Sequence, residues 1–145
     1  MSAIVPKLLN NAVIDGPDKR PVFVLSEKKA IYQAENKNQK EAFTFQIDSN
    51  LINSTQTKKC DKGLLIEDKR IFLVELKGVD FNTACSQLLV TYNWIKTKLP
   101  GYKYFCRAVV KEMPSKQNYP TSYKKLMKIT NKQFKSGSVK MIEQI

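Results

Sequence analysis

The sequence predicts a mixed α/β (α+β) fold with a central mixed β-sheet and flanking helices, in one domain spanning residues 1–145. Two strands are predicted at about 60–66 and 70–77, since apolar runs at 63–66 and 71–74 are separated by a short polar turn, which predicts an antiparallel hairpin. A long amphipathic pattern and a further apolar run follow, and this order favours a helix and a parallel strand. With 42% hydrophobic and 26% charged residues, the chain can bury a core.

The first 40 residues form a lead-in whose elements are less sharply marked. A short apolar piece at 6–9 precedes an Asp-Gly-Pro-Asp run at 15–18, which is typical of a turn. Residues 21–25 are predicted as a strand or as a buried segment leading into the core. Residues 26–40 remain ambiguous between a capped helix and a strand.

The predicted core covers residues 42–110 and begins with a strand at 42–47, followed by a polar loop at 53–59. In the hairpin that comes next, a turn with its tip at Asp68 pairs Leu65 with Ile71. A shift of one residue would reverse the face of every side chain, so this register is a testable prediction.

A helix is predicted behind the hairpin, capped by Asp80 or Asn82 and running to about Leu99. The run 102–110 is rich in aromatic and β-branched residues and predicts a strand parallel to the second hairpin strand. A basic C-terminal segment, 115–145, is expected to hold a helix at 122–134 and a short strand at 138–142.

Three charged residues, Asp61, Glu75 and Lys77, stand at the open end of the predicted hairpin. In the register above, Asp61 faces Glu75, and alternation puts Lys77 on the same face. Two carboxylates suit Mg²⁺ or Mn²⁺, the backbone carbonyl of Leu76 could add a third oxygen, and the lysine could position the attacking water. The pattern predicts metal-dependent phosphodiester hydrolysis. The alternative is a surface hairpin with a salt-bridged cluster, but strands that are apolar on both faces argue against it.

This segment resembles the PD-(D/E)XK nuclease superfamily over about residues 42–110, through Glu75-Leu76-Lys77 with Asp61 14 positions ahead and a helix behind. The resemblance implies a restriction-endonuclease-like fold, Mg²⁺ held by the acidic pair, and a lysine that assists the water. Some members carry a glutamine in the following helix, which places Gln87 near the site, whereas Tyr92 falls on the core face. Members often have a glutamate on a first helix, and the candidates Glu27, Glu35 and Glu41 stay open.

The amino-acid composition limits which partners the protein can bind and which reactions it can catalyse. The formal net charge is +12, which favours a polyanionic partner, mainly nucleic acid, with an anionic membrane surface second. Within the nuclease hypothesis, DNA is expected rather than RNA. The chain has no histidine, which excludes hydrolases, ribonucleases and metal sites that depend on one. Its three cysteines, at 60, 85 and 106, are widely spaced and are expected to be reduced thiols rather than a disulfide framework or a zinc site.

The basic excess is concentrated near the C-terminus, where residues 113–142 hold seven lysines and no acidic residue. Lysine binds phosphate without discriminating between bases, so this segment predicts non-specific contact with a nucleic-acid backbone. The alternative is an ordinary solvated helix. The lysines predicted to bind nucleic acid are Lys116, Lys124, Lys125, Lys128, Lys132 and Lys135, four of which would share one face of a helix.

The sequence therefore supports two hypotheses about function. The first is a Mg²⁺-dependent nuclease. The second is a non-catalytic protein of the same fold that binds nucleic acid or acts as an immunity or partner protein. A third function, binding to an anionic membrane surface, is not expected, because no amphipathic helix shows a bulky apolar face opposite the lysines. No apolar run approaches the length of a membrane span. Residues 1–10 do not resemble a secretion signal, so a cytoplasmic location is expected, with a homodimer or a protein partner left open.

Overall fold

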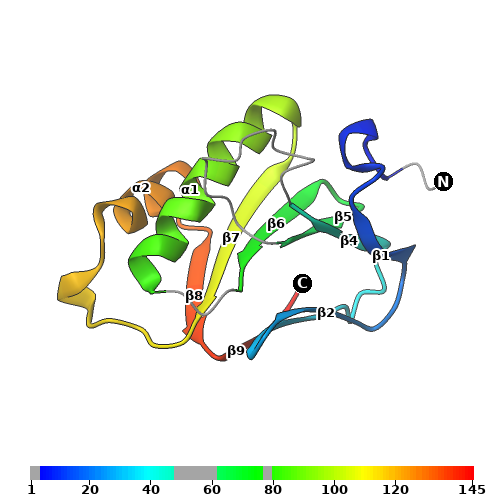
Figure 1. Cartoon of the computed structure of the whole chain (residues 1–145). Coiled ribbons are helices and arrows are strands. Elements are labelled where there is room, and N and C mark those ends of the chain that lie inside the picture. The colour runs from blue at the N-terminus through cyan, green and yellow to red at the C-terminus, as the bar shows by residue number, and fades with distance from the viewer. Residues whose placement is uncertain (1–3, 48–61, 77–79) are drawn as a thin grey trace.

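The computed structural model describes residues 4–47, 62–76 and 80–145. The described ranges form a mixed α/β structure with two β-sheets, a six-stranded sheet in the order β1-β4-β5-β6-β7-β8 and a three-stranded sheet in the order β2-β3-β9. Both helices cover one face of the larger sheet, and the smaller sheet covers the other (Figure 1). The prediction of a central mixed sheet with flanking helices is confirmed, but a second sheet covers the face opposite the helices.

The elements follow in chain order. The strands are β1 (Val13–Asp18), β2 (Val22–Glu27), β3 (Ala30–Glu35), β4 (Ala42–Gln46), β5 (Lys62–Ile66), β6 (Arg70–Glu75), β7 (Lys103–Val110), β8 (Phe134–Ser138) and β9 (Lys140–Gln144). The α-helices are α1 (Phe81–Lys98) and α2 (Thr121–Ile129), and two short 3-10 turns lie at Lys7–Leu9 and Lys116–Asn118.

The hairpin of β5 and β6 has the predicted register, because Leu65 pairs with Ile71 and Lys62 pairs with Val74. β6 then pairs in parallel with β7, as predicted, and β7 pairs in parallel with β8. The helix between β6 and β7 begins where Asp80 accepts a hydrogen bond from the backbone N–H of Thr83 at 2.8 Å. These neighbours on both sides make β6 a central strand of the sheet.

Alternation along the central strands divides the core into two layers. On the helix side, Leu73 of β6 and Cys106 of β7 pack with Leu88 of α1. On the other side, Val74 and Phe105 pack with Tyr32 of β3. Residues 71, 73 and 75 of β6 therefore face the helices, while residues 72, 74 and 76 face the smaller sheet.

Gly63 in β5 is required by close packing. A Cβ built on Gly63 would lie 2.2 Å from the ring of Phe45 in the neighbouring strand β4. The aromatic ring occupies the space that a side chain would need, so only glycine lets Phe45 cover this part of the sheet.

The predicted turn at 15–18 is wrong, because these residues belong to β1, which pairs with β4 at one edge of the sheet. The register shifts twice along β1, so the glycine and proline produce irregularities in a strand rather than a reversal. Proline is tolerated there because an edge strand need not donate every backbone hydrogen bond. Asp15 instead donates its backbone N–H to Thr44 Oγ1 at 3.1 Å.

Two further boundaries differ from the prediction. The ambiguous stretch 26–40 holds β3, which forms a hairpin with β2 across a two-residue turn. The predicted helix 122–134 ends at Ile129, because Asn131 and Lys132 have φ values of 54° and 65° that leave the helical region. Phe134 then enters β8 and packs against Phe81 at the start of α1.

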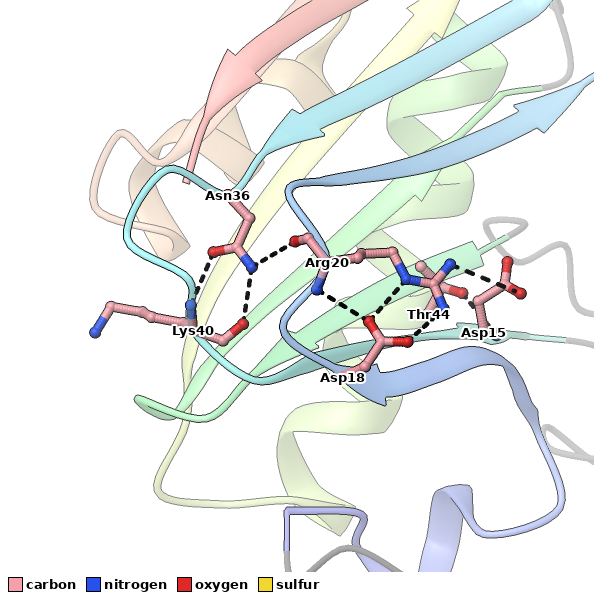
Figure 2. A network of polar contacts seen from close by, with 6 residues as sticks. All are labelled: Asp15, Asp18, Arg20, Asn36, Lys40 and Thr44. Carbon is pink, nitrogen blue, oxygen red and sulfur yellow. Dashed lines mark hydrogen bonds and ion pairs between the residues drawn. The ribbon is translucent and has the colours of Figure 1, made fainter.

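The segments that carry the chain between the two sheets are tied together by polar contacts (Figure 2). Buried Asn36 donates from Nδ2 to the carbonyls of Arg20 and Lys40 at 2.9 and 2.8 Å, and its Oδ1 accepts from the Lys40 N–H. Arg20 in turn donates to both carboxylate oxygens of Asp18, which lowers the pKa of that carboxyl. One buried amide thus joins the β1–β2 and β3–β4 connections.

The two sheets are also joined by a buried ion pair. Arg107 of β7 is 3% exposed and donates from Nε to Glu143 Oε1 of β9 at 2.6 Å. The Tyr32 hydroxyl donates to the same oxygen at 2.5 Å, and Lys135 Nζ lies 3.8 Å from Oε2. Burial, followed by the Glu143 charge, raises the pKa of Tyr32. The guanidinium also donates to the carbonyls of Cys106 and Gln133.

Candidate functional site

Glu75 is the last residue of β6 and is fully buried. It pairs with Ala108 of β7, and alternation turns its side chain toward the helix-covered face. Burying a carboxylate in a protein interior costs several kcal/mol unless other groups compensate for the charge. A glutamate in this position of a central strand is therefore a candidate for a functional group.

Leu76 follows Glu75 and is also fully buried, but its side chain packs on the opposite face with Val74 and Phe105. Leu76 directly follows Glu75, the last residue of β6 that pairs with β7, and the packing of its side chain holds this strand end in place. The sequence predicts that the backbone carbonyl of Leu76 is a metal ligand, and this stays a prediction.

Gln87 lies on α1, the helix that packs against β6 and β7, and is 7% exposed. Its side-chain oxygen Oε1 is buried and has no hydrogen-bond partner among the described residues. Leaving a buried polar atom unsatisfied costs about 1 to 3 kcal/mol. An amide kept at such a cost on the same face of the sheet as Glu75 is consistent with the predicted place of Gln87 near the site.

Tyr92 occupies another side of α1. It is 4% exposed, and its hydroxyl donates to the Ile129 carbonyl of α2 at 3.1 Å, so its predicted role in the core is confirmed. Helical geometry separates Gln87 from Tyr92 by about 140° around the axis. Gln87 therefore lies on a different flank of α1 from the side that contacts α2.

The other two predicted catalytic residues, Asp61 and Lys77, lie outside the described residues. The hairpin pairing is described up to Lys62 and Val74 and has the register on which their convergence with Glu75 depends. In the described part of the chain, no group of three or more acidic or cysteine side chains is arranged to hold a metal ion.

None of the three glutamates considered for a first-helix position stands on a helix. Glu27 ends β2, Glu35 ends β3, and Glu41 directly precedes β4. Glu27 lies 3.6 Å from Lys62 Nζ, and Glu35 extends from the side of β3 that faces away from the larger sheet. The chain segment that would carry such a helix forms a β-hairpin instead, because its apolar residues alternate with period two.

A cleft of about 480 Å³ lies where β7 ends and α1 begins. Its lining includes Asp80 and Phe81 of the helix start and Lys111 and Glu112 after β7. In sheets with parallel strands, ligands commonly bind at the carboxyl ends of the strands, and this cleft lies at that end of β7. Asp80 contributes negative charge, because hydrogen bonds from the backbone and side chain of Thr83 lower its pKa.

The six lysines predicted to bind nucleic acid do not form one surface on a helix. Lys124, Lys125 and Lys128 are exposed on α2, but Lys132 lies in the turn beyond it. The prediction that four lysines share one face of a helix is wrong, because α2 ends at Ile129, before Lys132. The remaining two also lie on other elements: Lys116 in a 3-10 turn and Lys135 in β8.

Three other lysines, which the sequence pattern did not indicate as a site, line one cavity at the end of β7. Lys28 and Lys29 form the turn between β2 and β3, and Lys111 follows β7. The signal in the sequence is modest: a lysine pair between two alternating segments, and a lysine directly after an apolar run. Nothing in the local pattern brings residues so distant in sequence together.

The described cysteines do not offer a nucleophile. Cys85 and Cys106 are buried free thiols, as the sequence predicts, and burial raises the pKa of each to about 12. Each is therefore protonated near neutral pH, whereas a nucleophilic cysteine reacts as the thiolate. Cys60 lies outside the described residues.

Comparison with known proteins adds no family assignment. No protein-family model matches the chain, and neither the curated proteins nor the solved structures contain a significant match. No helix within the described ranges combines the length and apolar character needed to cross a membrane. Any functional conclusion therefore rests on the residues and geometry of this chain.

Proposed function

We propose that this protein is a divalent-metal-dependent nuclease, with Glu75 as one of its metal ligands. The observation that carries the proposal is a fully buried glutamate at the carboxyl end of a central strand, at the junction of antiparallel and parallel pairing. The described hairpin register, in which Lys62 pairs with Val74, supports the predicted approach of Asp61 to Glu75.

The donor chemistry on the helix-covered face fits a hard cation. Glu75 offers carboxylate oxygens as ligands, and the buried amide oxygen of Gln87, which has no partner among the described residues, offers an acceptor for a water beside the cation. Mg²⁺ and Mn²⁺ prefer oxygen ligands, and no soft ligand is required. When bound, the metal would offset charge on the scissile phosphate and lower the pKa of a coordinated water.

Each protein group then has a distinct role. Glu75, with Asp61, would hold the cation, and its burial in a packed strand end limits movement during the reaction. The Gln87 oxygen would accept a hydrogen bond from the attacking water, and Lys77 would stabilise negative charge that develops on the phosphate. Anchoring of Leu76 on the opposite face would keep this strand end in register.

DNA is the proposed substrate because a chain with a formal net charge of +12 attracts a polyanion at long range. The described lysines contact a phosphate backbone without reading bases, so cleavage would depend little on sequence. Affinity for DNA would fall steeply as salt concentration rises, because binding releases condensed counterions.

The experiment is DNA cleavage in Mg²⁺ or Mn²⁺, with EDTA as the metal-free condition. The wild-type protein should cleave only with metal, and Glu75→Gln should lower the rate at least about 100-fold, the scale expected for losing one transition-state electrostatic contact. The matched control is Glu35→Gln, which makes the same chemical change on the outer side of β3 and should leave the rate unchanged.

Calorimetric titration with Mn²⁺ separates a catalytic from a non-catalytic protein. The wild type should bind Mn²⁺ and Glu75→Gln should not. Wild-type protein that binds DNA but neither binds metal nor cleaves would contradict the proposal and favour the non-catalytic alternative. Cleavage by Glu75→Gln at the wild-type rate would remove Glu75 from the site.

A further inference from the structure

A second cavity, of about 420 Å³, lies between the tip of the β2–β3 hairpin, the end of β7 and the corner that joins β8 to β9. Lys28 and Lys29 line it from the hairpin, Lys111 from the end of β7, and Val139 from the corner. We call this cavity the lysine pocket. The ends of β7 and β8 and the start of β9 come together at the lower edge of the molecule in Figure 1.

The lysine pocket carries an excess of positive charge. Three lysines and one glutamate, Glu27, contribute to its lining. The Glu27 carboxylate lies 3.6 Å from Lys62 Nζ, so its charge is already offset by a cation outside the lining. Among the described residues, no carboxylate forms an ion pair with Lys28, Lys29 or Lys111. The three ammonium groups are therefore available to an anion.

The walls of the pocket are held in unusual backbone conformations. Lys28 has a φ of 54° and Val139 a φ of 63°, both in the left-handed region. This region costs roughly 1 to 2 kcal/mol for a residue with a Cβ, and it is most unfavourable for a β-branched residue such as valine. Strained residues persist where surrounding structure holds them, and they concentrate at functional sites.

Two hydrogen bonds hold the Val139 corner in place. Its N–H donates to the Val110 carbonyl at the end of β7 at 2.9 Å, and its carbonyl accepts from the Ile31 N–H of β3 at 3.0 Å. Val139 thus bridges a strand of each sheet. The corner that forms one wall of the pocket is therefore fixed to both sheets, and such anchoring favours a preorganised binding site.

The lysine pocket adjoins the cleft at the start of α1, because Lys111 lines both. The two hollows therefore follow the edge where β7 ends, with positive charge in the pocket and the acidic residues Asp80 and Glu112 in the cleft. A bound polyanion would be held by the lysine pocket and would lead toward the edge on which β6 also ends.

We propose that the lysine pocket binds a backbone phosphate of a DNA strand and directs that strand across the cleft toward Glu75. The direction of the strand rests on the proposed function, whereas binding of the phosphate does not require cleavage. Lys19 and Lys37 are the natural comparison, because they are equally basic but lie exposed in the β1–β2 and β3–β4 connections rather than around a cavity.

The test is the affinity for a fluorescein-labelled DNA oligonucleotide, measured by fluorescence anisotropy in EDTA so that no cleavage occurs. The variant Lys28→Gly/Lys111→Gln should weaken binding about 10-fold at low salt. The slope of log affinity against log salt should become shallower by about 1, the change expected for one lost phosphate contact. The control Lys19→Gln/Lys37→Gln removes the same charge from two exposed lysines in the β1–β2 and β3–β4 connections and should weaken binding less than about 2-fold.

Folding of the pocket variant is checked by thermal unfolding. Glycine accepts a positive φ without strain, so Lys28→Gly should leave the midpoint equal to or above that of the wild type. Equal losses of affinity in the two double variants, or a larger loss in Lys19→Gln/Lys37→Gln, would overturn the proposed binding by the lysine pocket and leave only an effect of net charge.

Failure of the pocket and failure of the nuclease proposal give different results. If wild-type protein cleaves DNA with metal and the pocket variant binds normally, the pocket proposal fails and the nuclease proposal stands. If wild-type protein never cleaves but the pocket variant loses affinity selectively, the pocket stands as a DNA-binding site.

Discussion

Glutamates lie on both sides of the six-stranded sheet, Glu75 fully buried and Glu143 with a side chain 13% exposed, and the two environments differ. Glu143 lies between the sheets, where its carboxylate accepts hydrogen bonds from Arg107 and Tyr32 and lies 3.8 Å from Lys135 Nζ. Glu75 lies on the helix-covered face at the end of β6, on the same face as an amide oxygen that has no described partner.

The comparison separates two reasons for burying charge. The Glu143 carboxylate, bonded to a guanidinium and a hydroxyl, joins two layers of the structure. Removing one charged partner of such a pair leaves the remaining charge without its counter-charge in the interior. A carboxylate at a strand end, beside a helix that carries an unsatisfied amide, is typical of a site that accepts a ligand. Glu143 is thus expected to govern stability and Glu75 to govern activity.

The largest expected effect on stability comes from Arg107→Met. This change leaves Glu143 buried without its main counter-charge and should lower the free energy of unfolding by about 3 to 5 kcal/mol. Arg20→Met is the matched control, because the Arg20–Asp18 pair is about a third exposed or more on each side and should cost no more than about 1 kcal/mol. Urea unfolding measures both.

The same measurement on Glu75→Gln decides whether the comparison holds. A structural Glu75 would lose as much stability as Arg107→Met, whereas a functional Glu75 would lose activity and little stability. An equal loss in the two variants would therefore remove the distinction between the two buried carboxylates.

Gln87→Met is expected to change the free energy of unfolding less than Arg107→Met does, and in the opposite direction. Methionine has a similar volume and needs no hydrogen bond, so relief of the unsatisfied Oε1 should raise the free energy of unfolding by about 1 kcal/mol. Cleavage should fall about 10-fold, as in other trade-offs between stability and activity. Gln33→Met, on the outer side of β3, is the control and should change neither quantity appreciably. Unchanged cleavage in Gln87→Met would make this glutamine a packing residue.

The smallest effect tests how well water is excluded from the helix-covered face. Cys85 and Cys106 both pack there, and burial raises the pKa of each thiol from 9.0 to about 12. Neither should react with iodoacetamide at pH 8 in the folded protein, as mass spectrometry of peptides would show. Rapid alkylation of either thiol would mean that water reaches this layer, and burial of Glu75 would then be less costly than argued.

The same thiols predict that the protein becomes less stable as the pH rises above about 9. Their folded pKa values lie above the unfolded value, so the unfolded chain loses these protons first as the pH rises. Their contribution to stability is fully present below pH 9 and is lost between about pH 9 and 12. A Cys85→Ala/Cys106→Ala variant should show a weaker decline across this range.

Features set by neighbouring residues could be predicted from the sequence. The hairpin of β5 and β6 was found in its register because apolar residues flank a short polar turn, and a slip of one residue would expose a whole face. The helix α1 was predicted with a cap at Asp80 or Asn82 and an end near Leu99, because capping residues act on the backbone next to them, and the structure places the cap at Asp80. Glu75 and Gln87 were selected from the same stretch.

Features set by distant residues required the tertiary structure. The glycine and proline of β1 favour a turn by themselves, but pairing with β4 keeps the segment extended. The second sheet brings β9, at the end of the chain, beside β3 near its beginning, and no local pattern specifies that pairing. The helix α2 ends early because Phe134 is needed in β8, where its ring stacks with Phe81.

The sequence by itself therefore determined the central hairpin, the helix behind it and the acidic residue at the strand end, because turn geometry, periodicity and capping act over a few residues. Only the tertiary structure decided that Glu75 is fully buried and that Lys28, Lys111 and Val139 surround one cavity. Burial and convergence depend on which distant strands pair and which faces pack, and those choices minimise the free energy of the whole chain rather than of any segment.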